Sequence, residues 1–136
     1  MSLRFEIFPA DLDLTVDFYT RVLRFDLVTY PHEDDDEQYV FLQRDAVRVG
    51  AVSQPVTTFK DHRRPPVGVE IVLEVDDVEA ELEHVLAAGW EIDEDLTLRP
   101  WGLSDFRIFD PDGYYLRITD RFPPARRPGP GPAPAW

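Results

Sequence analysis

The strongest constraint on the fold is that the chain repeats one pattern of elements. An alternating segment at residues 3–8 is followed by Asp11, a candidate helix cap, and by apolar residues at helical spacing. Residues 69–75 alternate in the same way, and Asp77 precedes a second such stripe. Asp11 and Asp77 stand 66 residues apart, close to half of the 122 residues before a Pro-rich end. This spacing indicates an internal duplication.

Each half continues with three candidate strands. The predicted helical stripes are Leu12, Val16, Tyr19, Val22 and Leu23 in the first half, and Val78, Leu82, Val85 and Leu86 in the second. The predicted strands after them are residues 25–30, 38–43 and 46–52, then 91–98, 103–109 and 114–119. Asp110-Pro111-Asp112-Gly113 suits a tight turn before the last strand. The sequence therefore predicts an α+β fold of two tandem βαβββ modules, with the helices on the outer face of a cupped, mixed sheet.

The domain boundaries follow from composition. We expect one domain over residues 1–122, with module one at 1–52, a linker at 53–66 that is rich in proline and charge, and module two at 67–122. Residues 123–136 are mostly Pro, Gly and Ala, a composition that supports polyproline II or coil, and we expect a tail there.

Composition excludes several functional classes. The chain has no cysteine, which removes disulfides and thiolate chemistry, and its net charge of −13 repels nucleic acid and anionic membranes. It shows no cationic leader and no long apolar run, so we expect a cytoplasmic protein with no membrane partner. The acidic charge favours a cationic small molecule as ligand, although an acidic surface also serves solubility alone.

The order of elements resembles the vicinal oxygen chelate superfamily of glyoxalases, bleomycin resistance proteins and extradiol dioxygenases, in its bleomycin-resistance-like branch. The residues that carry the resemblance are Asp11-Leu12-Asp13, Phe18-Tyr19, Val22-Leu23-Arg24-Phe25, Glu74-Val75-Asp76-Asp77-Val78, Ala87-Ala88-Gly89 and 107–114. Arg24 stands where the family usually has Gly, which implies a longer or differently closed turn. The resemblance also implies a homodimer, swapped or unswapped.

The resemblance implies four positions for a divalent metal, one on the first and one on the last strand of each module. They fall on Arg4, Gly50 within one residue, Glu70 and Arg117, of which only Glu70 can bind a metal. The three histidines, His32, His62 and His84, show no metal-ligand spacing. We therefore expect no metal and no other cofactor. Glu70 and Arg117 are expected to form a buried ion pair in the metal's place.

Strand parity identifies the candidate binding residues. In residues 69–75 the odd positions are apolar and belong against the helices, which turns the even positions the other way. The same rule and the loop at Trp101 give eight expected ligand contacts: Arg4, Phe8, Glu70, Trp101, Arg107, Phe109, Tyr115 and Arg117. Half-exposed strands also carry such residues simply as cross-strand pairs, and that interpretation stays open.

The expected function is metal-free binding and sequestration of a small molecule, as in antibiotic resistance, with no catalytic residue. The expected binding face shows no His, Cys or Ser–His pair that could act as nucleophile or base. One alternative is a metal-dependent lyase, isomerase or dioxygenase of the same superfamily, with Glu70 as base. Another is an interaction module whose Pro-rich tail docks a partner.

Overall fold

The fold is described from a computed structural model, which describes residues 1–29, 39–53 and 66–121. The chain divides into two compact units. Unit 1 takes residues 1–65 together with 110–114, and unit 2 takes residues 66–109 together with 115–136. The expected linker, apart from its ends, and the expected tail lie outside the described residues, so the predicted domain boundaries stay a prediction.

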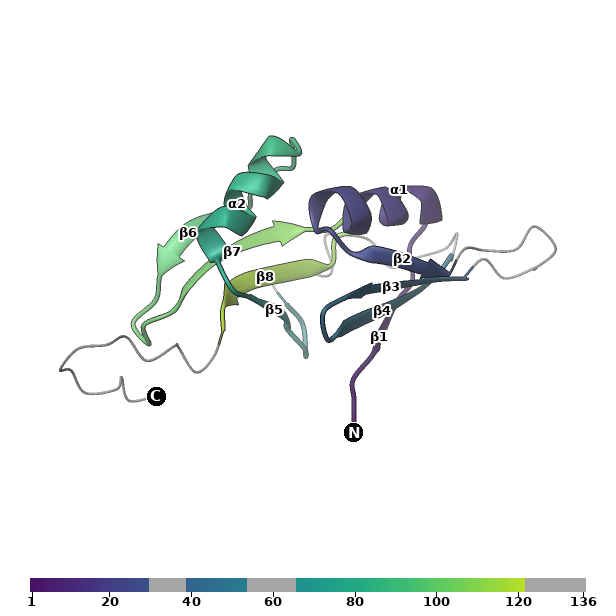
Figure 1. The fold of residues 1–136 in the computed structure, drawn as a ribbon, viewed down its shortest axis with the longest axis horizontal. Helices are drawn as coiled ribbons and strands as arrows, with labels where there is room; N and C mark the ends of the chain where they lie inside the picture. The colour runs from purple at the N-terminus through teal and green to yellow at the C-terminus, as the bar shows by residue number, and fades with distance from the viewer. Residues whose placement is uncertain (30–38, 54–65, 122–136) are drawn as a thin grey trace. The chain divides into compact units, whose positions relative to one another are not determined.

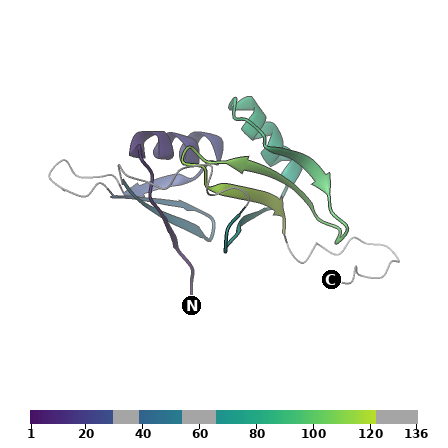
Figure 2. The same ribbon diagram turned by 180° about the vertical axis from the view of Figure 1, so that it is seen from behind.

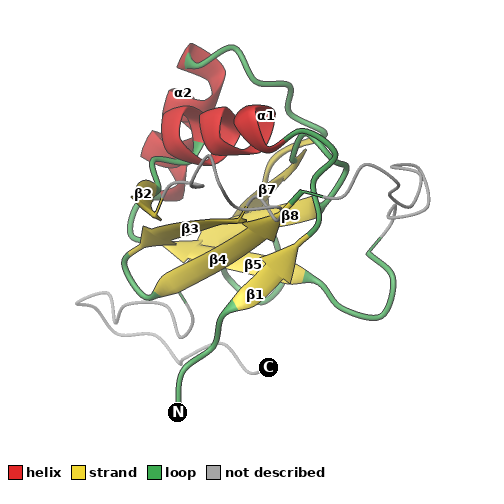
Figure 3. Cartoon of the chain, turned by 90° about the vertical axis from the view of Figure 1, so that its right-hand side faces the viewer, coloured by secondary structure: helices red, strands yellow, loops and turns green. Residues whose placement is uncertain are grey.

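Unit 1 contains the first βαβββ module. Its elements are β1 (Phe5–Ile7), α1 (Leu12–Asp17), the π-helical turn η1 (Phe18–Val22), β2 (Asp26–Thr29), β3 (Tyr39–Arg44) and β4 (Val47–Val52). The sheet has the order β1-β4-β3-β2, with β1 parallel to β4 and the other pairs antiparallel (Figure 1). Its edge strand β1 lies beside β4 (Figure 3).

Unit 2 repeats this topology. Its elements are β5 (Ile71–Val75), α2 (Val78–Ala87), β6 (Glu94–Leu98), β7 (Ser104–Phe109) and β8 (Tyr115–Asp120). The sheet order is β5-β8-β7-β6, again with one parallel pair, β5 with β8, at the edge. Each helix lies on one side of its own sheet, also when seen from behind (Figure 2). The predicted α+β fold of two βαβββ modules is confirmed. No helix among the described residues is long and apolar enough to span a membrane.

Alternation along the strands builds each core. The buried apolar side chains of unit 1 are Ile7, Leu12, Phe18, Tyr19, Val22, Leu23, Phe25, Val40, Leu42, Val49 and Ala51. Those of unit 2 are Leu73, Val78, Val85, Leu103, Phe106, Ile108, Leu116 and Ile118. Two predicted core residues are wrong: Val69, which precedes β5 and is 79% exposed, and Leu86, which lies on the outer side of α2. Glu81 is buried in α2 instead, a position that an apolar stripe does not reveal.

The first helix ends differently from an ordinary α-helix. The Leu23 N–H donates to the Phe18 carbonyl, and the Phe25 N–H donates to the Tyr19 carbonyl, which closes a wide final turn. Arg24 takes φ 59°, the left-handed conformation that glycine adopts without strain. Of the two expected alternatives, the structure has the differently closed turn and not the longer one, because β2 begins two residues later and a π-helical turn makes the closure.

The turn between β7 and β8 belongs to unit 1 and ties its N-terminal elements together. Asp112 accepts the Ala10 N–H at 2.9 Å, and the Tyr114 hydroxyl accepts the Phe8 N–H at 3.1 Å. Asp110 is buried, and its carboxylate accepts the N–H groups of Asp112 and Tyr114, each at 2.9 Å, and the Tyr19 hydroxyl at 3.0 Å. Burial raises the pKa of Asp110 to about 6, above the ordinary 3.8, even though these hydrogen bonds favour the charged form.

Replacing Asp110 by Asn tests this burial. A folded-state pKa above the unfolded one contributes stability that is complete below pH 3.8 and is lost as the pH rises through 6. The amide oxygen of Asn can still accept the two backbone N–H groups, and its NH2 group can donate to the Tyr19 hydroxyl. Asn does not titrate in this pH range. We expect the free energy of unfolding of the natural protein, relative to Asp110→Asn, to fall by up to ~3 kcal/mol between pH 4 and pH 7. Urea denaturation across this range measures the difference, and a constant difference would contradict the prediction.

Candidate functional site

The side of the unit 2 sheet opposite its apolar core carries charged and aromatic residues. Phe106, Ile108, Leu116 and Ile118 are buried, so the alternate residues of β7 and β8 turn to the other side of the sheet. We call this side the polar sheet face, and its members on β7 and β8 are Asp105, Arg107, Phe109, Tyr115, Arg117 and Thr119. The predicted alternation of these two strands is confirmed, and the binding role of the residues on this side stays a prediction.

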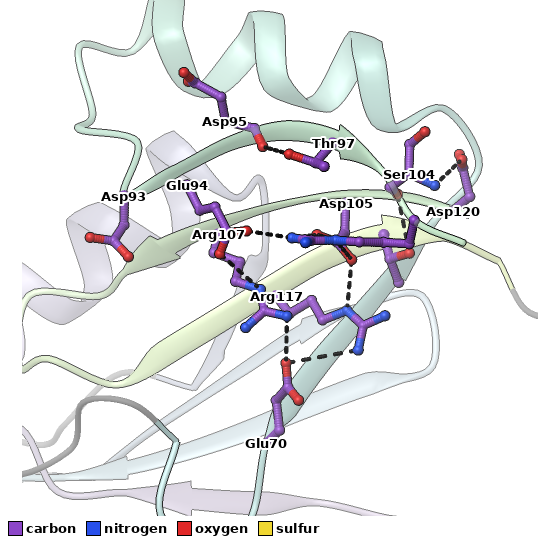
Figure 4. A network of polar contacts seen from close by, with 12 residues as sticks. Glu70, Asp93, Glu94, Asp95, Thr97, Ser104, Asp105, Arg107, Arg117 and Asp120 are labelled. Carbon is purple, nitrogen blue, oxygen red and sulfur yellow. Dashed lines mark hydrogen bonds and ion pairs between the residues drawn. The ribbon is translucent and has the colours of Figure 1, made fainter. Parts of the chain in front are cut away.

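Asp105 is the anchor of the polar sheet face. Its carboxylate is fully buried and accepts the Arg99 Nε–H at 3.0 Å, the Arg99 Nη2–H at 2.8 Å and the Arg117 Nε–H at 3.1 Å (Figure 4). Arg99 also donates to Glu94 at 2.6 Å. The hydrogen bonds that Arg99 donates to Asp105, and then the one to Glu94, raise the pKa of Arg99 above its usual range, so its charge is permanent.

Arg107 is held less tightly than Arg99. Its Nη2 lies 3.8 Å from the Glu70 Oε1, and its Nε lies 3.6 Å from the Glu94 Oε2. Both distances exceed a hydrogen bond, and the buried Nε has no hydrogen-bond partner among the described residues. Arg117 is directly opposite Arg107 in the strand register, which places two like charges side by side.

Glu70 directly precedes β5 in the sequence and lies near the guanidinium groups of Arg107 and Arg117. The Glu70 Oε1 is 3.9 Å from the Arg117 Nη1 and 3.8 Å from the Arg107 Nη2 (Figure 4). The expected buried ion pair of Glu70 with Arg117 is wrong in its details, because the Glu70 side chain is 32% exposed and the contact is long. The close and buried partner of Arg117 is Asp105.

Aromatic rings flank the two arginines. The Arg117 guanidinium carbon lies 5.5 Å from the centre of the Trp101 ring, and that of Arg107 lies 5.7 Å from the centre of the Tyr115 ring. Phe109 stacks against Tyr115 with ring centres 4.7 Å apart. The Tyr115 hydroxyl donates to Asp93 at 3.0 Å, and partial burial together with this carboxylate raises the pKa of Tyr115.

Six of the eight expected ligand contacts therefore belong to unit 2, and the structure brings them together with three residues that the sequence reasoning did not name. The unnamed ones are Glu94, Arg99 and Asp105. Parity alone would have found Asp105, since it lies two residues before Arg107 on the same strand. Arg99 comes from a loop, where no periodicity indicates a side chain's direction.

The two remaining expected contacts, Arg4 and Phe8, flank β1 in unit 1. The Arg4 Nε forms an ion pair with Glu6 at 2.8 Å, and Glu6 also accepts the Tyr39 hydroxyl at 3.2 Å. A Cβ on Gly50 would collide with the ends of the Glu6 and Tyr39 side chains, so a glycine lets them lie across the strand. The prediction that both modules line one cup stays a prediction.

The residues at the family's metal positions do not fit a divalent ion. In the strand register Gly50 is opposite Glu6, and Arg117 is opposite Val72. The carboxylates beside these positions, Glu6 in unit 1 and Glu70 and Asp105 in unit 2, are each ion-paired with arginine. Within residues 1–29, 39–53 and 66–121 no group of three or more His, Cys, Asp or Glu side chains is placed to hold a metal. A guanidinium beside a cation adds repulsion in place of a ligand.

Comparison with known proteins agrees with the topology. Residues 3–118 match the family model described as Glyoxalase/Bleomycin resistance protein/Dioxygenase superfamily. No curated protein sequence matches the chain.

Solved structures share the fold at low sequence identity. TioX from Micromonospora sp. ML1 is 23% identical, with a TM-score of 0.71 over 88% of this chain and 98% of that one. A bleomycin resistance determinant encoded on the transposon Tn5 is 21% identical, with a TM-score of 0.70 over 90% and 98%. UcmS2 is 19% identical, with a TM-score of 0.73 over 89% and 98%. At these identities the likeness shows the fold alone.

Replacing Asp105 by Asn tests the anchor. The variant leaves two arginines around a neutral amide, and breaking a buried ion pair from one side costs about 3 kcal/mol or more. We expect the free energy of unfolding in urea to fall by about that amount. The matched control is Asp76→Asn, which breaks the ion pair of Arg121 with an aspartate that is 84% exposed and should leave the denaturation midpoint unchanged. Equal effects of the two variants would contradict the anchoring role.

Proposed function

The chain belongs to the glyoxalase, bleomycin resistance protein and dioxygenase superfamily, and from this premise we propose that it binds a small organic molecule and sequesters it without transforming it. The site is the polar sheet face of unit 2 with Trp101 and Glu70. The observation that carries the proposal is the pair of half-buried arginines, Arg107 and Arg117, each beside an aromatic ring.

This combination suits binding because it offers two kinds of contact in one place. Arg107 and Arg117 are 20% and 18% exposed, so their guanidinium groups are partly removed from water, where a polar interaction is stronger. Trp101, Phe109 and Tyr115 add flat apolar surface, which contributes favourable burial for a planar ligand. Ligands with a polar group on a flat apolar body therefore match this face best.

Sequestration is favoured over catalysis because Asp105 and Glu94 are hydrogen-bonded to arginines and Glu70 faces two positive charges. Asp105 accepts hydrogen bonds from Arg99 and Arg117, and Glu94 accepts one from Arg99. Glu70, the residue considered as a base for an enzyme, lies between two guanidinium groups. A general base needs a free lone pair within reach of the substrate proton.

The proposal extends to the class of ligand, the cellular location and the oligomeric state. One similar structure is that of a bleomycin resistance determinant, so an antibiotic is a reasonable class of ligand for this chain too. The expected cytoplasmic location and homodimer also stay predictions.

Calorimetric titration tests the proposal, with bleomycin and 2-naphthoate as probes. We expect at least one probe to bind with a Kd of tens of micromolar or below and to be recovered unchanged by mass spectrometry. Trp101→Ala removes a ring beside Arg117, and we expect about tenfold weaker binding, since such a contact contributes on the order of 1 kcal/mol.

Leu86→Ala is the matched control, because Leu86 is an exposed apolar residue on α2, away from the polar sheet face. It should leave the Kd unchanged. Absence of heat up to 1 mM with bleomycin, with 2-naphthoate and with the amide and amine analogues of 2-naphthoate would reject binding at this face. A chemically altered probe would reject sequestration.

A further inference from the structure

The three arginines around Asp105 differ in how far their hydrogen-bonding capacity is used. Arg99 donates from Nε and Nη2 to Asp105 and Glu94 at 2.6–3.2 Å. Arg117 donates from Nε to Asp105 at 3.1 Å, and its outer Nη1 has a long ion-pair contact to Glu70 and no hydrogen bond within the described part of the chain. Arg107 has ion-pair distances of 3.6 and 3.8 Å and a buried Nε without a hydrogen-bond partner among the described residues. The guanidinium nitrogens nearest to Glu70, Arg107 Nη2 and Arg117 Nη1, thus meet that carboxylate only at long ion-pair distances.

Glu70 lies between these donors without bonding closely to either. One of its oxygens, Oε1, is 3.8 Å from Arg107 and 3.9 Å from Arg117, whereas a charge-assisted N–H···O bond is about 2.7–2.9 Å long. The residue precedes β5 and is outside the strand pairing, so its backbone is not fixed by the ladder. A carboxylate therefore already occupies the space between the two guanidinium groups, but it is held loosely.

We propose that Arg107 and Arg117 form a clamp for the carboxylate of the ligand, and that Glu70 is an internal carboxylate which the ligand displaces. This inference rests on the proposed function and names the chemical class of its ligand. Guanidinium groups match a carboxylate because their planar N–H donors meet its two oxygens in parallel. A ligand that approaches within 3 Å gains hydrogen bonds that Glu70 does not make in this arrangement.

The aromatic residues specify the rest of the ligand. Trp101 lies beside Arg117 and Tyr115 lies beside Arg107, so both arginines of the clamp have a flat apolar neighbour. A carboxylate attached directly to a planar ring system would place its charge at the clamp and its ring against these side chains. The clamp therefore points to aromatic carboxylic acids.

The net charge of −13 does not oppose this assignment. Exposed charges are screened over about 10 Å at 0.1 M salt, so distant carboxylates have little influence on a bound ligand. The charges next to the bound ligand therefore determine which ligand charge is preferred. Displacement of Glu70 leaves Arg107 and Arg117 facing the ligand. Lower salt should accordingly slow the association of an acid without abolishing its preference.

Three probes with the same ring system and similar size test the charge of the ligand: 2-naphthoate, 2-naphthamide and 2-naphthylmethylamine. Calorimetry with the full chain at 0.15 M salt should give a Kd for the acid at least tenfold lower than for the amide or the amine. In ¹H–¹⁵N spectra the Nε–H signals of Arg107 and Arg117 should shift with the acid. An amide or amine that binds as tightly as the acid would overturn the clamp.

Two variants separate the roles of the clamp residues. Arg107→Gln should weaken binding of the acid at least tenfold while folding normally, because its ion pairs are long. Glu70→Gln should tighten binding of the acid about threefold or more, because the competing charge is gone. Arg121→Gln is the control, since this exposed arginine pairs with Asp76 and should leave the Kd unchanged. Circular dichroism and urea denaturation confirm that each variant is folded.

The sign of the Glu70 effect decides between two opposite assignments. If Glu70 were a receptor for a cationic ligand, Glu70→Gln would weaken binding of the amine and would leave binding of the acid unchanged. That result would overturn the clamp and keep the proposed function. Failure of all three naphthalene probes and of bleomycin would instead reject the proposed function itself, so the two failures are distinguishable.

Discussion

The fully buried carboxylate of Asp105 is the interaction on which the polar sheet face depends. The strand register places Arg107 opposite Arg117, and like charges in that position destabilise a sheet. Asp105 offsets this repulsion because it binds the Nε of Arg117 and both inner nitrogens of Arg99. Asp105 therefore supplies the negative charge that this arginine-rich surface needs, and the Nη groups of Arg107 and Arg117 nearest to Glu70 keep only long contacts to that carboxylate.

The two modules share a topology and differ in what they place on it. Gly50 of β4 and Arg117 of β8 hold corresponding places, each on the side of its sheet away from the apolar core. In unit 1 the absence of a side chain lets Glu6 and Tyr39 lie across the strand, whereas in unit 2 a guanidinium fills that space. One backbone arrangement thus supports two different chemistries, because strand pairing uses only main-chain groups.

Much of the fold could be predicted from the sequence because it follows local periodicity. Alternation fixes which side of β7 and β8 is buried, and the 66-residue spacing of Asp11 and Asp77 reveals the repeat. The sequence does not reveal the π-helical turn before Arg24, because this turn depends on a hydrogen bond between residues five apart, where an α-helix has four. The site was predicted in part: parity placed Arg107 and Arg117, but not which carboxylate each one binds. The choice of Asp105 over Glu70 depends on burial and on the direction of the loop that carries Arg99, which no repeat in the sequence encodes.

The contrast between Arg99 and Arg107 shows how a sheet surface can be both stable and available to a ligand. A buried donor without an acceptor costs about 1–3 kcal/mol, so a fold retains one only where other contacts compensate. At this face the compensation comes from the tight bonds of Arg99 with Asp105, two residues before Arg107 on β7, and with Glu94, opposite Arg107 on β6. Arg99 thus uses its hydrogen-bonding capacity within the fold, whereas the contacts of Arg107 to carboxylates are long. The positive charge of the polar sheet face thus comes from guanidinium groups that Asp105 holds in place.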